Sequence, residues 1–265
     1  MLGRSATAVA ALFLAGAQAF GCVGCRCSKK DAAPAASASA TGPVVLAPLS
    51  EPSWLVDLPV PGHALAKVAV PLGAVHAAPV VIALHGSFDR PEWQCGHWAS
   101  ISGGRPFVLC PSGVAQEGRF SWGSPESTAK ELRAALTALK KRYGAHVAPG
   151  SVVLAGYGLG ADHAIWIQKQ EPGFFSHMAL VEGGTEKWSS TMAAAFAQRG
   201  GKRILFACAH EACVPNAQRA RLFSVGAGLD VKSVTLVDEQ RAFSPKVVRA
   251  LKKEWPWLAA GGERP

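Results

Sequence analysis

Apolar runs that alternate with amphipathic stretches are the feature that most limits how this chain can fold. Five short runs are almost entirely apolar, with many β-branched residues: 79–84, 106–109, 151–155, 177–181 and 203–207. A sixth run, 230–237, alternates more, and 63–70 alternates in a way that suits an edge strand or an opening hairpin. Continuous apolar runs of this length are typical of strands buried on both faces of a parallel sheet.

Helical segments are expected between most of these runs. The clearest follows Ser124, a capping residue, opens with Pro125 and stops at Gly144. Others are expected over 159–169, 191–199, 215–225 and 245–254. Alternation of strands and helices over this length predicts an α/β fold, a doubly wound and mostly parallel sheet with helices on both faces.

An export leader is predicted at the start of the chain. A short apolar run followed by Ala17-Gln18-Ala19, a small-x-small cleavage site, indicates a signal peptide over 1–21. A Gly-Cys pair follows and resembles a bacterial lipobox, so Cys22, or alternatively Cys25, is a candidate lipid anchor. Plain secretion and a metal site on the closely spaced cysteines are the other interpretations.

A tether is expected between this leader and the folded region. Residues 22–52 are rich in Ala, Ser and Pro, which favours a flexible linker, and the α/β domain is expected over 53–260. Leader, candidate anchor and tether together predict an extracytoplasmic location, secreted or held at a membrane surface. The net charge of +9 is spread along the chain. Its densest groups lie at expected helix ends, so we expect no nucleic-acid partner.

Cysteine usage in the expected domain fits the same compartment. The domain contains Cys95, Cys110, Cys208 and Cys213. In an oxidising environment the simplest pairing joins nearest neighbours, Cys95 with Cys110 and Cys208 with Cys213. Buried free thiols are the alternative.

One stretch carries the clearest indication of function. Residues 151–161 predict a buried strand that turns through Gly156-Tyr157-Gly158-Leu159-Gly160 directly into a helix. This stretch resembles the nucleophile elbow of α/β-hydrolases, G-x-S-x-G, with Gly158 in the position of the serine. The resemblance covers residues 54–257 and implies an α/β-hydrolase fold. It also implies a strained, positive-φ backbone at the tip of the elbow, which glycine relieves.

The resemblance implies further site positions. His85-Gly86-Ser87 corresponds to the loop that supplies one backbone N–H of the oxyanion hole, here from Ser87, and Leu159 supplies the other. Glu211 falls in the position of the acid, and Arg241 falls in the position of the histidine. These two side chains either form an ion pair or remain separate, solvated loop charges.

The replacements predict that ordinary serine-hydrolase chemistry is lost. Glycine offers no nucleophile, and arginine stays protonated and cannot accept a proton. We therefore expect a pseudo-hydrolase, without metal or cofactor, that acts as a binding or structural module and has a small-molecule ligand as a candidate partner. Candidates for lining its pocket are His85 and three tryptophans expected in loops, Trp93, Trp98 and Trp122. Core or lid packing is the alternative for the tryptophans.

Two other interpretations remain open. An extracytoplasmic, esterase-like or peptidase-like hydrolase would need a displaced nucleophile, and its candidate serines and bases are Ser87, Ser121, Ser124, His85, His163, His177 and His210. The second is dinucleotide binding, because Gly156-x-Gly158-x-x-Ala161 follows a strand and Glu182 ends the next strand. That fingerprint normally opens its domain, whereas here at least two strands are expected before it.

Overall fold

The computed structural model describes residues 44–150, 152–170, 173–236 and 243–260. The predicted signal peptide, Cys22 and most of the tether lie outside these residues. Ordered structure begins earlier than the expected boundary at 53, because Leu49 is buried and its N–H donates to the carbonyl of Ala74 at 3.0 Å. No described helix combines the length and the apolar character needed to cross a membrane.

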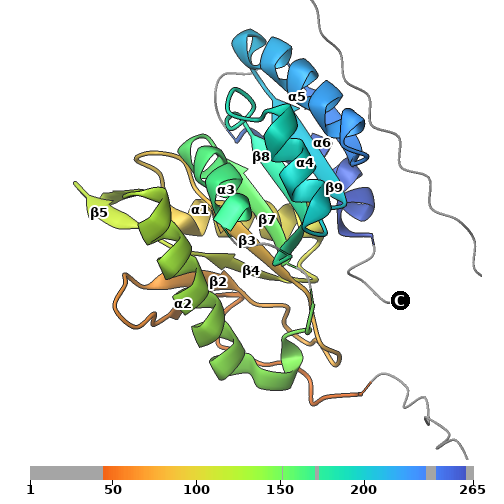
Figure 1. Cartoon of the computed structure of the whole chain (residues 1–265). Coiled ribbons are helices and arrows are strands. Elements are labelled where there is room, and N and C mark those ends of the chain that lie inside the picture. The colour runs from red at the N-terminus through yellow and green to blue at the C-terminus, as the bar shows by residue number, and fades with distance from the viewer. Residues whose placement is uncertain (1–43, 151, 171–172, 237–242, 261–265) are drawn as a thin grey trace, which may run out of the picture. The chain divides into compact units, whose positions relative to one another are not determined.

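A central sheet of eight strands organises the domain (Figure 1). In the order of the sheet, the strands are β1 (Leu55–Leu58), β2 (Ala66–Ala69), β4 (Phe107–Cys110), β3 (Val80–Leu84), β7 (Val152–Tyr157), β8 (Phe175–Val181), β9 (Arg203–Cys208) and β10 (Asp230–Thr235). β1 pairs with β2 and β2 with β4 in antiparallel fashion, and every pair from β4 to β10 is parallel. The predicted doubly wound, mostly parallel fold is confirmed, and the alternating segment 63–70 contains β2 of an edge hairpin.

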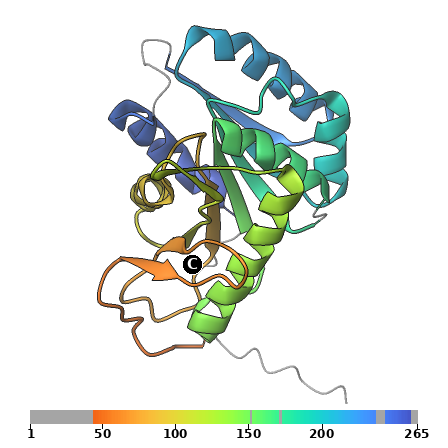
Figure 2. The same cartoon turned by 90° about the vertical axis from the view of Figure 1, so that its left-hand side faces the viewer.

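Helices cover both faces of the sheet (Figure 2). One face carries α2 (Pro125–Tyr143), α3 (Leu159–Gln170), α4 (Ser190–Gln198) and α5 (Val214–Gly226), and the other carries α1 (Pro91–Ser102) and α6 (Pro245–Ala259). Ser124 caps α2 as expected, because its side chain accepts from the N–H of Ser127. α6 continues past its expected end, since Trp255 and Leu258 remain buried against the sheet.

Helix α1 is not anticipated by the sequence pattern, and it corrects the expected place of two tryptophans. Trp93 and Trp98 lie on this helix rather than in loops. Trp98 is 1% exposed, and its ring packs edge-on against Trp255 of α6, so it belongs to the core rather than to a pocket wall. Trp93 is 49% exposed. A further element that the pattern misses is the small hairpin of β5 (Val114–Gln116) and β6 (Arg119–Ser121).

Both nearest-neighbour disulfides are present. Cys95 of α1 bonds to Cys110 at the end of β4, with Cα atoms 5.9 Å apart. Cys208 at the end of β9 bonds to Cys213, with Cα atoms 5.5 Å apart. The first bond fastens a helix to the sheet, and the second closes a short loop at the carboxyl end of a strand.

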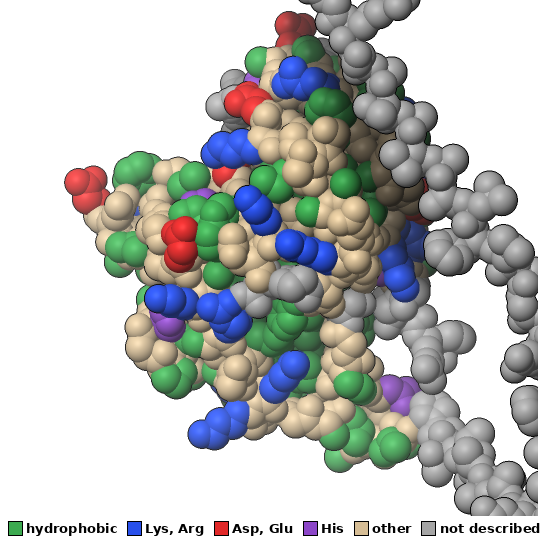
Figure 3. Space-filling view, in the orientation of Figure 1, with side chains coloured by type: hydrophobic (Ala, Val, Ile, Leu, Met, Phe, Trp, Pro, Cys, Tyr) green, Lys and Arg blue, Asp and Glu red, His purple; other side chains and the backbone are tan. Residues whose placement is uncertain are grey.

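Basic side chains are spread over the face that carries α2 to α5 (Figure 3). They are interspersed with apolar and uncharged surface on this face. Three of them, Lys140, Lys141 and Arg142, lie in the last turn of α2, where cations complement the helix dipole. The excess of positive charge therefore has a local structural explanation at its densest point.

Candidate active site

The elbow at the end of β7 has the expected backbone. Gly158 lies between the last residue of β7 and the first of α3, with a φ of 53°. A Cβ added to Gly156 would lie 2.5 Å from the Cα of Ala161, and one added to Gly160 would lie 2.5 Å from the carbonyl oxygen of His85. Strand and helix thus pass too closely for any side chain at the two flanking glycines.

The tip of the elbow differs from its flanks because it has room for a side chain. A Cβ on Gly158 would meet nothing closer than the Cα of Gly86, at 3.7 Å. Backbone hydrogen bonds hold the tip on both sides: its N–H donates to Val181 at 2.9 Å, and its carbonyl accepts from Ala161 at 3.0 Å. Gly158 therefore forms the tip of a tight strand-to-helix turn at which a side chain would have room but would meet a positive φ.

The segment after β3 lies beside the elbow and is fixed by His85. This imidazole is fully buried, with Nδ1 2.7 Å from the carbonyl of Gly86 and Nε2 2.9 Å from the carbonyl of Ser112. Trp122 stacks on the ring with centroids 4.4 Å apart, and its Nε1 donates to the His85 carbonyl at 2.7 Å. With both ring nitrogens engaged, His85 positions the loop and is not placed as a base. The oxyanion role of the Ser87 and Leu159 N–H groups stays a prediction.

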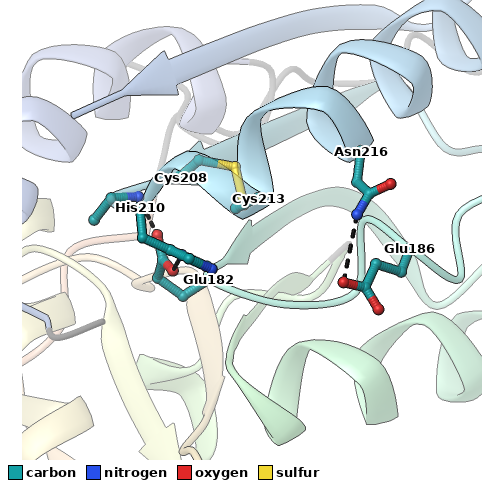
Figure 4. The surroundings of a disulfide bond; sticks show 7 residues. Glu182, Glu186, Cys208, His210, Cys213 and Asn216 are labelled. Atoms are coloured by element: carbon teal, nitrogen blue, oxygen red, sulfur yellow. Dashed lines mark hydrogen bonds and ion pairs between the residues drawn. A yellow bond between two sulfur atoms is a disulfide. The ribbon is translucent and has the colours of Figure 1, made fainter. Parts of the chain in front are cut away.

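An acid and a histidine meet at the ends of the next two strands (Figure 4). Glu182 directly follows β8 and is 7% exposed, and His210 lies two residues beyond β9. The carboxylate of Glu182 accepts a hydrogen bond from the backbone N–H of Ala209 and pairs with Nδ1 of His210. Carboxyl ends of parallel strands share one edge of the sheet, which explains why these residues come together.

Local constraints hold this pair next to the elbow. The Cys208–Cys213 disulfide encloses Ala209 and His210 in its loop. Glu182 itself has a φ of 53°, a conformation that costs a non-glycine residue about 1–3 kcal/mol and that clusters at functional sites. A Cβ on Gly183 would lie 2.3 Å from the carbonyl oxygen of Gly158, so the turn after β8 packs directly against the elbow.

The residues expected in the acid and histidine positions are not part of this pair. Glu211 opens a short 3₁₀ turn, Glu211–Cys213, and its side chain is exposed. Arg241 lies outside the described residues, so its pairing with Glu211 stays a prediction. Glu182 and His210 were separate candidates in the sequence, and their pairing was not predicted. The sequence does place each residue shortly after an expected buried strand, and these two strands are neighbours in the sheet.

Two other histidines weighed as bases are part of the core. His163 of α3 is buried with Nδ1 2.9 Å from the hydroxyl of Thr128, and burial lowers its pKa. His177 lies on β8, and burial, reinforced by the charges of Arg203 and Lys202, lowers its pKa to about 4. Both are held neutral near pH 7 by their surroundings.

The remaining alternatives gain little from the geometry. Glu182, which a dinucleotide site would need for a ribose hydroxyl, is engaged by Ala209 and His210. Strands β1 to β4 precede the glycine-rich turn, so it does not open the domain. Within the part of the chain that the structure describes, no cluster of at least three His, Cys, Asp or Glu side chains is arranged to hold a metal ion.

Comparison with known proteins supports the architecture. No family model matches the sequence, and no curated protein matches it. Among solved structures, esterase PE8 superposes with a TM-score of 0.56 at 15% identity, covering 77% of this chain and 100% of that one. A putative dienelactone hydrolase from Klebsiella pneumoniae gives 0.56 at 14% identity, with coverage of 78% and 97%. A carboxylesterase from Mesorhizobium loti gives 0.54 at 16% identity, with coverage of 77% and 100%. Likeness at these identities establishes a shared fold and nothing finer.

Proposed function

Because the domain has the α/β-hydrolase fold, we propose that it is a pseudo-hydrolase: a hydrolase scaffold without a covalent nucleophile, serving as a binding or structural module. The observation that carries this proposal is Gly158, whose backbone has the elbow conformation and whose Cβ position is open. Acyl transfer through this elbow would need a hydroxyl or thiol at that point. Losing the nucleophile of a triad typically lowers the rate by several orders of magnitude.

Turnover of an activated ester tests the proposal. The wild-type full chain should hydrolyse p-nitrophenyl acetate and butyrate no faster than a protein of similar size and surface composition. Ser87→Ala and Ser121→Ala test the alternative nucleophiles, because Ser87 follows Gly86 beside the elbow and the two hydroxyls lie 3.3 Å apart. Robust wild-type turnover that either substitution abolishes would overturn the proposal.

A hydrolase whose nucleophile is displaced from residue 158 is the second candidate, and the Glu182–His210 pair favours the form of it in which the nucleophile is a water molecule. A carboxylate on Nδ1 orients an imidazole and stabilises its protonated form. In this mechanism His210 accepts a proton from a water molecule as the water oxygen attacks the ester carbonyl. The same proton then passes to the leaving alcohol, so that ester and water become acid and alcohol.

Three variants separate the two candidates. Water activation by His210 predicts turnover that falls sharply in His210→Ala, falls less in Glu182→Gln and persists in Ser87→Ala. A pseudo-hydrolase predicts the same background rate in all three variants and in the wild type. Turnover that depends on Ser87 but not on His210 would support a serine nucleophile and contradict both the water mechanism and the inert scaffold.

Export and anchoring form a separate part of the proposal. We propose that the domain works outside the cytoplasm, secreted or held by a lipid on Cys22, and its two disulfides support an oxidising compartment. Mass spectrometry of the amino-terminal peptide from a bacterial host tests the anchor. A diacylglyceryl adduct that Cys22→Ala removes would support it, and an unmodified terminus after residue 19 or 21 would show plain secretion instead.

A further inference from the structure

A pocket of about 420 Å³ lies apart from the elbow. It is an open hollow lined by the loop before β2, the start of the β5–β6 hairpin and the first two turns of α2. Gly158, Glu182 and His210 are not among the residues that line it. Its volume lies in the range of small-molecule sites.

Two glycines in the wall of this pocket allow close packing of its segments. Gly113 has a φ of 72°, and a Cβ there would lie 2.3 Å from the carbonyl oxygen of Ser121. A Cβ on Gly123 would lie 2.9 Å from the hydroxyl of Ser127, which itself lines the pocket. The wall formed by the hairpin and the entry to α2 therefore has no room for a side chain at either position.

One buried carboxylate dominates the chemistry of the pocket. Glu131 of α2 is 5% exposed, and its Oε1 accepts hydrogen bonds from the N–H groups of Ser112 at 3.0 Å and Gly113 at 2.9 Å. Within the described residues it forms no ion pair with a lysine, arginine or histidine. Burial raises the pKa of Glu131, and the Gly113 N–H and the nearby His63 offset this only in part. A cation placed in the pocket would relieve the burial of this charge.

We propose that this pocket binds a small molecule bearing a primary ammonium group, with the Glu131 carboxylate as its counter-ion. The hydroxyl of Ser127 donates to the carbonyl of Ser124 at 2.7 Å, so its lone pairs can accept from an ammonium. Ala64 and Val114 supply apolar surface for a short alkyl chain. An anion would be repelled by the buried carboxylate. A neutral ligand would leave that carboxylate without a counter-ion.

A purely structural role for Glu131 is the competing account. In that account the carboxylate only fastens the Ser112–Gly113 segment to α2, and the pocket holds water. Both accounts retain the backbone hydrogen bonds in Glu131→Gln, because the amide oxygen still accepts from the two N–H groups. Only the ammonium site predicts that ligand affinity depends on the negative charge.

Amide NMR of the ¹⁵N-labelled full chain with n-butylammonium chloride tests the proposal. The Ser112 and Gly113 signals report directly on Glu131, and they should shift in a saturable manner. The isosteric neutral probe, n-butanol, should cause a smaller shift without saturation over the same range. Glu131→Gln should weaken n-butylammonium binding at least about tenfold, whereas Glu126→Gln should not. Glu126 is exposed on the same helix and does not line the pocket, so its substitution removes an equal charge outside the site.

The pH dependence of the same signals provides a second readout if Glu131→Gln fails to fold. Binding to the wild type should weaken as falling pH protonates Glu131. The titratable groups that act on this carboxyl are His63 and His85. The weakening should persist in His63→Gln, which removes the exposed imidazole from the pocket wall. Equal shifts with n-butanol and n-butylammonium, or unchanged affinity in Glu131→Gln or at low pH, would overturn the proposal.

Discussion

The elbow and the neighbouring ends of β8 and β9 differ in what they contain. At the elbow, the flanking glycines and the positive φ of Gly158 form a tight strand-to-helix turn whose tip carries no side chain. At the ends of β8 and β9, the buried Glu182 pairs with the partly buried His210, at positions that the resemblance did not assign to an acid or a histidine.

This difference shows that close backbone packing restricts the residues flanking the turn, whereas it does not restrict which side chain stands at its tip. Close passage of strand and helix enforces glycine at 156 and 160 whatever the protein does, since any Cβ would overlap backbone atoms. Nothing steric enforces glycine at 158 apart from its φ. Glu182, by contrast, is a non-glycine residue with a positive φ. Its hydrogen bonds with Ala209 and His210 help to offset the cost of this backbone conformation.

The largest expected effect lies at the flanks of the elbow. Gly160→Ala should prevent folding or lower the free energy of unfolding by more than about 4 kcal/mol, because its Cβ would lie 2.5 Å from the carbonyls of Leu84 and His85. Gly158→Ala should cost less, about 1–3 kcal/mol, the penalty of a side chain at its positive φ. Urea denaturation of both variants measures the contrast. If the two variants lost similar free energies of unfolding, residue 160 would not be sterically more restricted than residue 158.

The acid–histidine pair should give the next largest effect. His210→Ala should lower the free energy of unfolding by about 2–3 kcal/mol, because it leaves the buried Glu182 carboxylate without its imidazole partner. The exposed neighbour is the matched control, and Glu211→Ala should change stability by less than about 0.5 kcal/mol. Denaturation midpoints in which Glu211→Ala is the more damaging change would contradict a stabilising pair between Glu182 and His210.

His177, near the start of β8, contrasts with His210 because its ring is buried without a carboxylate partner among the described residues, and its Nδ1 lies 3.2 Å from the hydroxyl of Ser176. The pKa of His177 falls to about 4 in the folded protein from an ordinary value near 6.5, because the ring is buried. As pH falls from 7 to 5, His177 therefore becomes protonated in the unfolded chain but stays neutral in the folded protein. This should remove about 2 kcal/mol of stability.

His177→Phe should abolish that part of the pH dependence. Denaturation at pH 7 and pH 5, at constant ionic strength, would show a smaller loss in the variant than in the wild type. Substitution of the exposed His76 by Gln should leave the wild-type dependence intact. If His177→Phe lost as much stability on acidification as the wild type, the ring would have to be protonated or exposed in the fold.

Gly158→Ser tests stability and chemistry at the tip of the elbow together. It should lower the free energy of unfolding by about 1–3 kcal/mol, since the tip has room for a Cβ and the penalty is its φ. The expected placement of Arg241 in the histidine position predicts that Gly158→Ser alone remains nearly inactive toward activated esters. Adding Arg241→His should give weak, measurable esterase activity. Activity in Gly158→Ser alone that His210→Ala abolishes would instead identify His210 as the base.

The sequence predicted what depends on local pattern and missed what depends on partners distant in the chain. Apolar runs located the parallel strands, and cap residues located α2, because burial and capping leave direct traces in residue order. Helix α1 was missed because its buried side, although spaced as in a helix, includes polar Gln94 and Ser102, while apolar Trp93 is exposed. Glu182 and His210 follow two different strands, so their pairing could be predicted only once β8 and β9 were known to be neighbours in the sheet.

The most direct test of the central claim is the mass of the full-length protein after exposure to a fluorophosphonate, followed by peptide mapping. Such reagents modify hydroxyls that a neighbouring base has activated. The account predicts no adduct on the wild type under conditions that fully modify a control serine esterase, because the elbow tip is Gly158. A stoichiometric adduct on a single serine, such as Ser87 or Ser121, would contradict it and establish a displaced nucleophile.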